Sequence, residues 1–330
     1  MLAEVDYIKR KAKFQNPDSD IIAHNQSMLE LIEFAEQIAI VDSTVLIQGK
    51  SGTGKGVFAK FIHNQSRRKT APFLAINCAA IPENLLESEL FGYTAGTFTG
   101  AEKKGKTGLI ELANGGTLFL DEIGELSPKL QAKFLHVIEN KEFMPVGGRK
   151  IKKANVRIIA ATNRNLAEMI KVNAFREDLF YRLNVIGLHI PPLCERPEDI
   201  PSLAYSFLRK FDQKYEASHE ISQECLDVLV NYPWKGNVRE LENLMERFSI
   251  TIKESVINVH DLPLKFLGQN KINLKNPNSE NTALAFLKEQ LEKEVIIAAY
   301  QKLGSSRKVA SSLKISQSSA SRLIRKYCQT

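Results

Sequence analysis

The sequence has no apolar run that approaches the ~18 residues a membrane-spanning helix requires. Its first residues alternate charge with apolarity and contain no signal-peptide core. Its four cysteines lie far apart with no Cys-x-x-Cys pair, which argues against a zinc knuckle or a disulfide framework. With 43% hydrophobic and 25% charged residues, the chain has an ordinary globular composition. We therefore expect a cytoplasmic protein, without a membrane partner, whose thiols are reduced and mostly structural.

Acidic residues are absent from the segment Val295–Thr330. The segment carries seven basic residues: Lys302, Arg307, Lys308, Lys314, Arg322, Arg325 and Lys326. Removing these seven from the 45 basic residues of the chain leaves 38, which equals the number of acidic residues. A compact basic tail beside a neutral body predicts a polyanionic partner, most often nucleic acid. A solvated basic face is the alternative, and charge alone does not decide between them.

The composition divides the chain into two unequal parts. Residues 268–281 (GQNKINLKNPNSEN) are rich in Asn and are typical of a linker. Before the linker, apolar runs typical of buried strands alternate with helical patterns, which predicts an α/β fold with a parallel sheet. The expected strands are Thr44–Gln48, Phe73–Asn77, Thr117–Leu120 and Val156–Ala160. From Arg196 to Leu267 the strand signals stop, so we expect a helical subdomain with helices over Ile200–Tyr215 and Val238–Ile250.

A glycine-rich motif follows the first expected strand. Its residues Gly49, Lys50, Ser51, Gly52, Thr53, Gly54 and Lys55 fit G-x-x-x-x-G-K, followed by Gly56 where Ser or Thr is usual. An amphipathic helix with Val57, Phe58, Phe61 and Ile62 begins directly after it. Backbone amides of such a loop surround phosphates, and the lysine neutralises their charge. The motif predicts a nucleotide site, with a glycine-rich turn that binds nothing as the alternative.

Two adjacent carboxylates, Asp121 and Glu122, end the third expected strand. At that position Asp121 can hold Mg²⁺ and Glu122 can polarise a water for attack on a γ-phosphate. Adjacent acids after a strand are often ordinary loop residues. Together with the glycine-rich loop, however, they predict nucleotide hydrolysis.

Seven further segments carry a family resemblance. They are SGTGKG at 51–56, NCAAIPENLLESELFG at 77–92, GTFTGA at 96–101, GGTLFLDEIG at 115–124, VRIIAATN at 156–163, FREDLFYRLN at 175–184 and GNVRELEN at 236–243. Residues 21–267 resemble the AAA+ ATPase domain of bacterial enhancer-binding proteins, the activators of sigma-54 RNA polymerase. The resemblance implies an α/β P-loop ATPase subdomain over 21–194 and a helical lid over 195–267, after a remnant of a linker helix in 1–20.

The resemblance also implies roles for individual residues. Asn163 matches the sensor of the γ-phosphate, and Asn77 matches the switch residue that holds Glu122 at rest. Arg176 and Arg182 match arginine fingers that a neighbouring subunit supplies, and Arg239 matches the second sensor in the lid. The chain departs from the family pattern at Gly56, where a glutamate is common, and at Lys235, where Pro is usual.

One loop is the segment that best distinguishes sigma-54 activators from other AAA+ proteins. Its residues are Gly96, Thr97, Phe98, Thr99, Gly100 and Ala101. A single aromatic at the centre of a polar, glycine-flanked loop is typical of a contact surface, although Phe98 could also pack on its own domain. In the resembling family this loop, normally with Ala in place of Thr97, contacts sigma-54.

The basic tail has the pattern of a helix-turn-helix unit over residues 282–330. Thr282 is positioned to cap a helix that ends near Gly304, and two short helices, Arg307–Leu313 and Gln317–Tyr327, flank a three-residue turn. The expected core residues are Val309, Ala310, Leu313, Ile315, Ala320, Leu323 and Ile324. The expected DNA-contacting residues are Gln317, Ser318, Ser319, Ser321, Arg322 and Arg325. A small helical domain without a DNA role is the alternative. The segment resembles the Fis-like and tyrosine-repressor-like helix-turn-helix units of these activators, which commonly have a glycine in the turn where this chain has Lys314.

These patterns together indicate a sigma-54-dependent activator. Such a protein binds upstream double-stranded DNA, assembles into a ring, which the resemblance implies is a hexamer, and uses ATP and Mg²⁺ to remodel the closed promoter complex. A AAA+ regulator that represses sigma-70 promoters is the first alternative, which the GTFTGA loop disfavours. An unfoldase that serves a protease is the second, which the basic tail disfavours.

Overall fold

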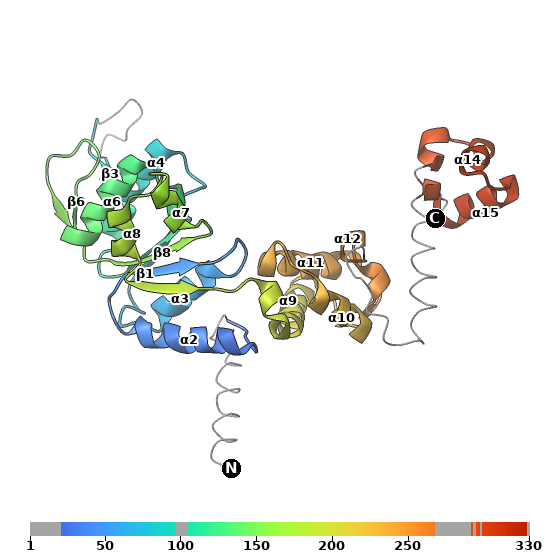
Figure 1. The fold of residues 1–330 in the computed structure, drawn as a ribbon, viewed down its shortest axis with the longest axis horizontal. Helices are drawn as coiled ribbons and strands as arrows, with labels where there is room; N and C mark the ends of the chain where they lie inside the picture. Colours follow the sequence, from blue (N-terminus) through green and yellow to red (C-terminus); the bar gives the residue numbers. More distant parts are fainter. Residues whose placement is uncertain (1–20, 97–104, 268–291, 293–294, 298, 329–330) are drawn as a thin grey trace, which may run out of the picture. The chain divides into compact units, whose positions relative to one another are not determined.

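The computed structural model describes residues 21–96, 105–267, 292, 295–297 and 299–328. The chain divides into two compact units, Met1–Val259 and His260–Thr330. The first unit holds an α/β part and a helical part, and the second holds the basic tail (Figure 1).

Five parallel strands form the central sheet of the first unit, in the order β2-β5-β8-β1-β9. They are β1 (Val45–Gln48), β2 (Phe73–Asn77), β5 (Thr117–Asp121), β8 (Arg157–Thr162) and β9 (Ile186–His189). The four expected strands are thus confirmed within two residues at each end. The edge strand β9 was not among them.

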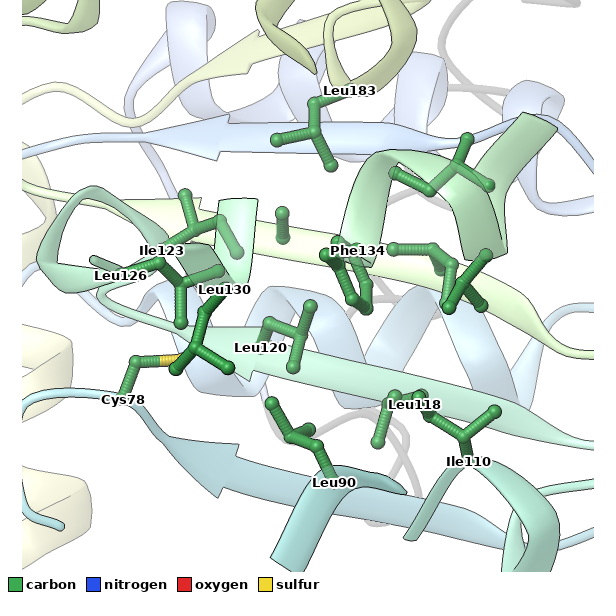
Figure 2. Close-up of a cluster of buried hydrophobic side chains, with 14 of the residues drawn as sticks. Cys78, Leu90, Ile110, Leu118, Leu120, Ile123, Leu126, Leu130, Phe134 and Leu183 are labelled. Atoms are coloured by element: carbon green, nitrogen blue, oxygen red, sulfur yellow. The ribbon is translucent and has the colours of Figure 1, made fainter. Parts of the chain in front are cut away.

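Helices cover both faces of this sheet. They are α2 (Gln26–Ala39), α3 (Lys55–Asn64), α4 (Glu83–Phe91), α5 (Leu109–Leu112), α6 (Pro128–Asn140), α7 (Leu166–Lys171) and α8 (Glu177–Leu183). Successive strand residues point to opposite faces, so each strand contributes to two cores. In β5, Leu118 and Leu120 pack with α4, α5, α6 and α8 (Figure 2), whereas Phe119 packs with α2 and α3. The strands read as continuous apolar runs because both faces are buried.

Two small hairpins stand beside the sheet. β3 (Gly92–Tyr93) pairs with β4 (Lys106–Thr107), and β6 (Glu142–Phe143) pairs with β7 (Lys152–Lys153). Backbone hydrogen bonds join them, since Val146 N–H donates to the Gly92 carbonyl and Thr94 N–H donates to the Val146 carbonyl.

The lid is mainly helical, with α9 (Ile200–Tyr215), α10 (Gln223–Asn231) and α11 (Asn237–Thr251), after the short turns η2 (Leu193–Glu195) and η3 (Pro197–Asp199). The prediction that strands stop at Arg196 is wrong, because β10 (Glu220–Ile221) pairs in parallel with β11 (Val256–Ile257). Each of these strands has two residues, which is too short for an alternating pattern to be visible in the sequence.

The second unit contains α12 (Leu264–Leu267), α14 (Ser306–Leu313) and α15 (Gln317–Cys328). The turn η4 (Val259–Asp261) precedes them and begins at the last residue of the first unit. Val309, Ala310, Ala320 and Ile324 are buried, and Leu313, Ile315 and Leu323 pack against them, which confirms the expected tail core. Lys314 adopts a left-handed conformation with φ 53° between α14 and α15. The greater part of the expected helix 282–303 lies outside the described residues.

All four cysteines are free, as expected, and Cys78 and Cys225 are buried. Within the described residues, no helix is both long and apolar enough to span a bilayer.

Candidate active site

Parallel pairing brings the carboxyl ends of four strands to one edge of the sheet. Asn77 lies opposite Asp121, and Gln48 lies opposite Thr162. In open α/β sheets this edge is where ligands bind. The glycine-rich loop leaves β1 at this edge, and Asp121 ends β5 at the same edge.

The glycine-rich loop positions Lys55 against Glu122. Lys55 is the first residue of α3 and is 6% exposed. Its ammonium donates to the Gly49 carbonyl at 3.1 Å and lies 3.5 Å from Glu122 Oε1. Gly54, which precedes it, has φ 104°, a conformation that favours glycine. The loop therefore ends at a helix N-terminus with a buried cation, two features that favour phosphate binding, and the Glu122 carboxylate lies beside that cation.

The two carboxylates lie in different environments. Burial is the largest cause that raises the pKa of Asp121, and the negative charge of Glu122 raises it further. The positive charge of Lys55 lowers this pKa and only partly offsets the rise. Asp121 Oδ1 accepts the Glu122 N–H at 3.0 Å, and Glu122 Oε2 accepts the Asn163 N–H at 3.1 Å. Glu122 itself has φ 54°, which turns the chain sharply at the end of β5. The structure thus brings Lys55, Asp121, Glu122 and the backbone of Asn163 together.

The lid touches the glycine-rich loop through α11. Arg239 Nη1 lies 3.3 Å from Ser51 Oγ, and the Arg239 N–H donates to the Gly52 carbonyl at 3.3 Å. Gly52 has φ 78°, and a Cβ added there would lie 2.3 Å from the Gly236 carbonyl oxygen. The two backbones are therefore in contact, and only glycine fits at position 52.

A cavity of about 1590 Å³ lies between the loop, the lid and α2. The predicted site residues that line it are Ser51, Gly52, Thr53, Gly54, Lys55, Gly56, Asn77, Asp121, Glu122 and Arg239. Val57, which the helical pattern placed on the apolar face of α3, also lines the cavity and is 40% exposed. Gly49 and Lys50 form the base of the loop and lie outside the lining.

Asn77 lies at the cavity but does not hold Glu122 in this conformation. Asn77 Oδ1 accepts the Ala79 N–H at 2.8 Å. In the described part of the chain, the Glu122 carboxylate contacts the Lys55 ammonium and the Asn163 N–H. The switch role of Asn77 therefore stays a prediction.

The two finger arginines lie on the surface, outside the lining of the cavity. Arg176 pairs with Asp178 at 2.6 Å, and Arg182 pairs with Glu139 on α6 at 2.9 Å. Both side chains are about half exposed, at 47% and 60%. Exposed pairs of this kind contribute little to stability, so either arginine can leave its partner at small cost.

Sequence reasoning missed three buried polar residues near the site: Gln131, Arg196 and Asp199. The Gln131 amide donates to the Leu126 and Ala174 carbonyls, and its oxygen accepts the Arg176 N–H at 2.8 Å. Gln131 thereby fixes the start of α8, which carries both finger arginines. No local pattern in the sequence distinguishes these residues from surface ones, because their partners lie far away along the chain.

In the tail, α15 presents the expected DNA-contacting residues to different extents. Gln317, Ser318, Arg322 and Arg325 are exposed, whereas Ser319 and Ser321 are half-buried. Ser319 N–H donates to Ser316 Oγ at 3.2 Å, and the same oxygen contacts the Ser318 hydroxyl at 2.9 Å. Part of the serine cluster therefore stabilises the start of α15.

Comparison with known families decides which class of ATPase this is. The Sigma-54 interaction domain family matches residues 21–189, and the AAA+ ATPase lid domain family matches residues 194–279. The chain belongs to the sigma-54 interaction domain family. The predictions of a AAA+ fold with a lid, of an ATPase, and of the sigma-54 activator class are confirmed at the level of this family.

Individual relatives agree with this assignment. A Nif-specific regulatory protein of Azospirillum lipoferum is 50% identical over 246 residues, which are 74% of this chain and 39% of that protein. The putative uric acid sigma-54-dependent transcriptional regulator UacR of Escherichia coli is 43% identical over 320 residues, 93% of this chain and 53% of that protein. The chain thus spans about half the length of these relatives or less. NtrX from Brucella abortus in complex with ATP has a similar structure, with a TM-score of 0.70 at 32% identity, covering 98% of this chain and 72% of that one.

Proposed function

We propose that this chain activates transcription from sigma-54 promoters by hydrolysing ATP. The observation that carries the proposal is the 3.5 Å approach of the Lys55 ammonium to the Glu122 carboxylate, at the edge of a parallel sheet, in a cavity that the lid residue Arg239 also lines. A phosphate-binding cation beside a carboxylate that can orient water is the arrangement that γ-phosphate hydrolysis needs. The ATP complex of the related NtrX supports a nucleotide in this cavity.

The motif residues have separate roles in this proposal. The loop amides and Lys55 bind the phosphates, and Glu122 acts as the base that orients the attacking water. Asn163 lies outside the lining of the cavity, donates its backbone N–H to Glu122, and senses the γ-phosphate. Asn77 is the switch that takes hold of Glu122 in another nucleotide state. Arg239 contacts the phosphates from the lid, so that the lid responds to the bound nucleotide.

Asp121 is the candidate ligand for Mg²⁺. Its carboxylate is a hard oxygen donor, and its raised pKa reflects burial near a second negative charge, which a cation would relieve. Within the described residues there is no cluster of three or more metal-ligating side chains, which agrees with a metal held by one or two carboxylates together with substrate phosphates. Mg²⁺ supplies charge neutralisation for the phosphates when it is bound.

Arg176 and Arg182 act on the nucleotide of a neighbouring subunit in this proposal. They lie outside the lining of the cavity of their own chain and are exposed on α8 and at its start. A ring oligomer, a hexamer by resemblance to the family, would bring them to the next cavity. Arginine forks bind phosphate oxygens in two places and stabilise the charge that spreads in the transition state.

The loop Gly96–Ala101 contacts sigma-54 in this proposal, and residues Thr97 to Ala101 lie outside the described part of the chain. Its stem is the β3–β4 hairpin, which Val146 links to the β6–β7 hairpin. Gly96 at the base has φ 73° and is exposed, with open space where a Cβ would stand.

The basic tail binds double-stranded DNA upstream of the promoter, with Arg322 and Arg325 exposed on α15 as candidate contacts. The proposal places the protein in the cytoplasm, where it meets sigma-54 RNA polymerase.

Transcription from a sigma-54 promoter in a purified system tests the proposed function, with Phe98→Ala as the decisive variant. We expect Phe98→Ala to keep ATPase activity and DNA binding and to lose open-complex formation. Normal activation by this variant would remove the loop role and favour a sigma-70 regulator.

A further inference from the structure

A buried ion pair outside the family motifs lies between the glycine-rich loop and the start of the lid. Arg196 is 3% exposed and Asp199 is 0% exposed. Arg196 Nη1 lies 3.8 Å from Asp199 Oδ2, and the Asp199 N–H donates to the Arg196 carbonyl across one turn. Burial lowers the pKa of the Arg196 guanidinium, and the charge of Asp199 opposes that shift. Arg196 also lines the cavity of the candidate active site.

The guanidinium holds the glycine-rich loop directly. Arg196 Nη2 donates to the Thr53 carbonyl at 2.9 Å, and Nη1 contacts Met28 Sδ on α2 at 3.4 Å. The Thr53 side chain is turned inward, with its hydroxyl donating to the Lys50 carbonyl at 2.9 Å. Thr53 is therefore fixed from two sides, through its carbonyl and through its hydroxyl.

The chemical consequence falls on the next amide. The Thr53 carbonyl belongs to the same peptide group as the Gly54 N–H, and Gly54 is the residue that precedes α3. Amides at a helix start have no acceptor within the helix and are available to an anion. A cation bound to the carbonyl draws electron density from the peptide group, which makes its N–H a stronger donor.

Asp199 connects this contact to the chain segment before α2. Asp199 Oδ1 accepts the backbone N–H groups of both His24 and Asn25. Asn25 is also the N-cap of α2, and its amide donates to Glu198 Oε2 at 2.9 Å. The pair thus joins three segments that are far apart in sequence: the entry to α2, the glycine-rich loop and the first turn of the lid.

Stability alone is a weak reason for this pair. Arg196 Nε and Asp199 Oδ2 have no hydrogen-bond partner among the described residues, and incompletely satisfied buried charges often stabilise a fold less than apolar groups of the same size. We propose that Arg196 is a positioning residue for nucleotide binding, which orients and polarises the Thr53–Gly54 peptide, with Asp199 anchoring it to the entry segment. This inference rests on the proposed nucleotide site.

The same chain offers a matched control. Arg157 is 1% exposed, donates to the Ala39 and Ile38 carbonyls, and also has an Nε without a hydrogen-bond partner among the described residues, but it caps the end of α2 away from the cavity. We expect Arg196→Met to raise the Kd for Mg-ADP and the KM for ATP about tenfold or more, because a hydrogen bond from a charged donor is lost, while kcat changes less than about threefold. Arg157→Met should lower Tm with the parental Kd.

Calorimetric titration with Mg-ADP gives the Kd, steady-state ATPase rates give KM and kcat, and thermal unfolding gives Tm for each variant. Arg196→Gln, which keeps a neutral donor near Thr53, is measured alongside and decides the matter if Arg196→Met does not fold. A parental Kd in either folded Arg196 variant, or an equal rise in Kd for Arg157→Met, would overturn the positioning role. Lys55→Ala distinguishes failure of the positioning role from failure of the proposed nucleotide site, since parental ADP affinity in that variant would show that the nucleotide site itself is misassigned.

Discussion

The Lys55 ammonium lies 3.5 Å from the Glu122 carboxylate, although 67 positions separate the two residues in the chain. Glu122 is also held by the backbone N–H of Asn163, so the acid is directed toward the strand edge where a γ-phosphate would stand. The two side chains that we propose for phosphate binding and for water orientation are therefore adjacent in the folded chain.

Glu122→Gln should leave ATP binding largely intact and reduce turnover by at least ~10²-fold. The change removes the base while it preserves the size of the side chain. Glu125→Gln is the control, because Glu125 lies one turn further on and pairs with Arg164. Phosphate-release rates measure turnover, and nucleotide titration measures ATP binding. Parental hydrolysis by Glu122→Gln would show that the base is elsewhere.

Mixing two inactive variants tests completion of the site between subunits. Arg182→Ala and Lys55→Ala should partly rescue each other, because some interfaces then pair an intact loop with an intact arginine. The chain that carries both substitutions should not rescue Arg182→Ala. Specific ATPase activity of the parent should rise with protein concentration. Concentration-independent hydrolysis by a proven monomer would contradict the proposed ring.

Gly52→Ala should weaken nucleotide binding at least ~10-fold. The left-handed backbone at Gly52 costs an alanine about 1 kcal/mol, and the added Cβ would also collide with the Gly236 carbonyl. Gly115→Ala is the control for the backbone cost alone, since Gly115 has φ 82° with open space around it. ADP titration and Tm of both variants distinguish the two contributions. Equal ADP affinity in the two variants would mean that the lid contact is unimportant for binding.

Lys314→Gly should stabilise the tail by up to about 1 kcal/mol, because Lys314 is held at φ 53°. Lys308→Gly, within α14, should destabilise it by a similar amount, since glycine there loses more conformational freedom on folding. Hydrogen exchange of the α14 and α15 amides in the intact 330-residue chain gives both values. A loss of protection in both variants would contradict this account of the turn.

Removal of everything after about residue 275 should leave a folded ATPase and abolish site-specific DNA binding, because the deleted segment carries the excess positive charge. In the intact chain, Arg322→Ala should cost ~1 to 3 kcal/mol of specific binding if that side chain reads a base. Arg247→Ala in the lid is the control. Gel-shift titrations at two salt concentrations measure each affinity. A truncated chain that still finds the same site would place recognition outside the tail.

The sequence was most informative where one segment determines its own structure. The strands around Ile47 and Phe119 read as buried because each contains an uninterrupted apolar run, Val45–Ile47 and Leu118–Leu120, and the α14–α15 turn was visible from the helical periodicity on either side of it. The glycine-rich loop and the acids at 121 and 122 form local motifs, so their meeting at one edge followed from a parallel sheet.

Other features depend on contacts between distant segments. Arg196 and Asp199 stand in a charged stretch that reads as surface, and only the folded chain places them against Thr53, His24 and Asn25. The two-residue strands β10 and β11 form because α10 and α11 bring them together. The left-handed conformation of Asn237, with φ 53° and 1% exposure, likewise follows from its contacts with Leu193 and Ser51.

The contact between Gly52 and Gly236 has a mechanical consequence. Where two backbones touch with no side chain between them, there is no compressible layer to absorb displacement. A displacement of the glycine-rich loop toward α11 would therefore act directly on the first turn of that helix. Because α11 has 15 residues, a rotation about this contact would displace the far end of the helix more than its first turn.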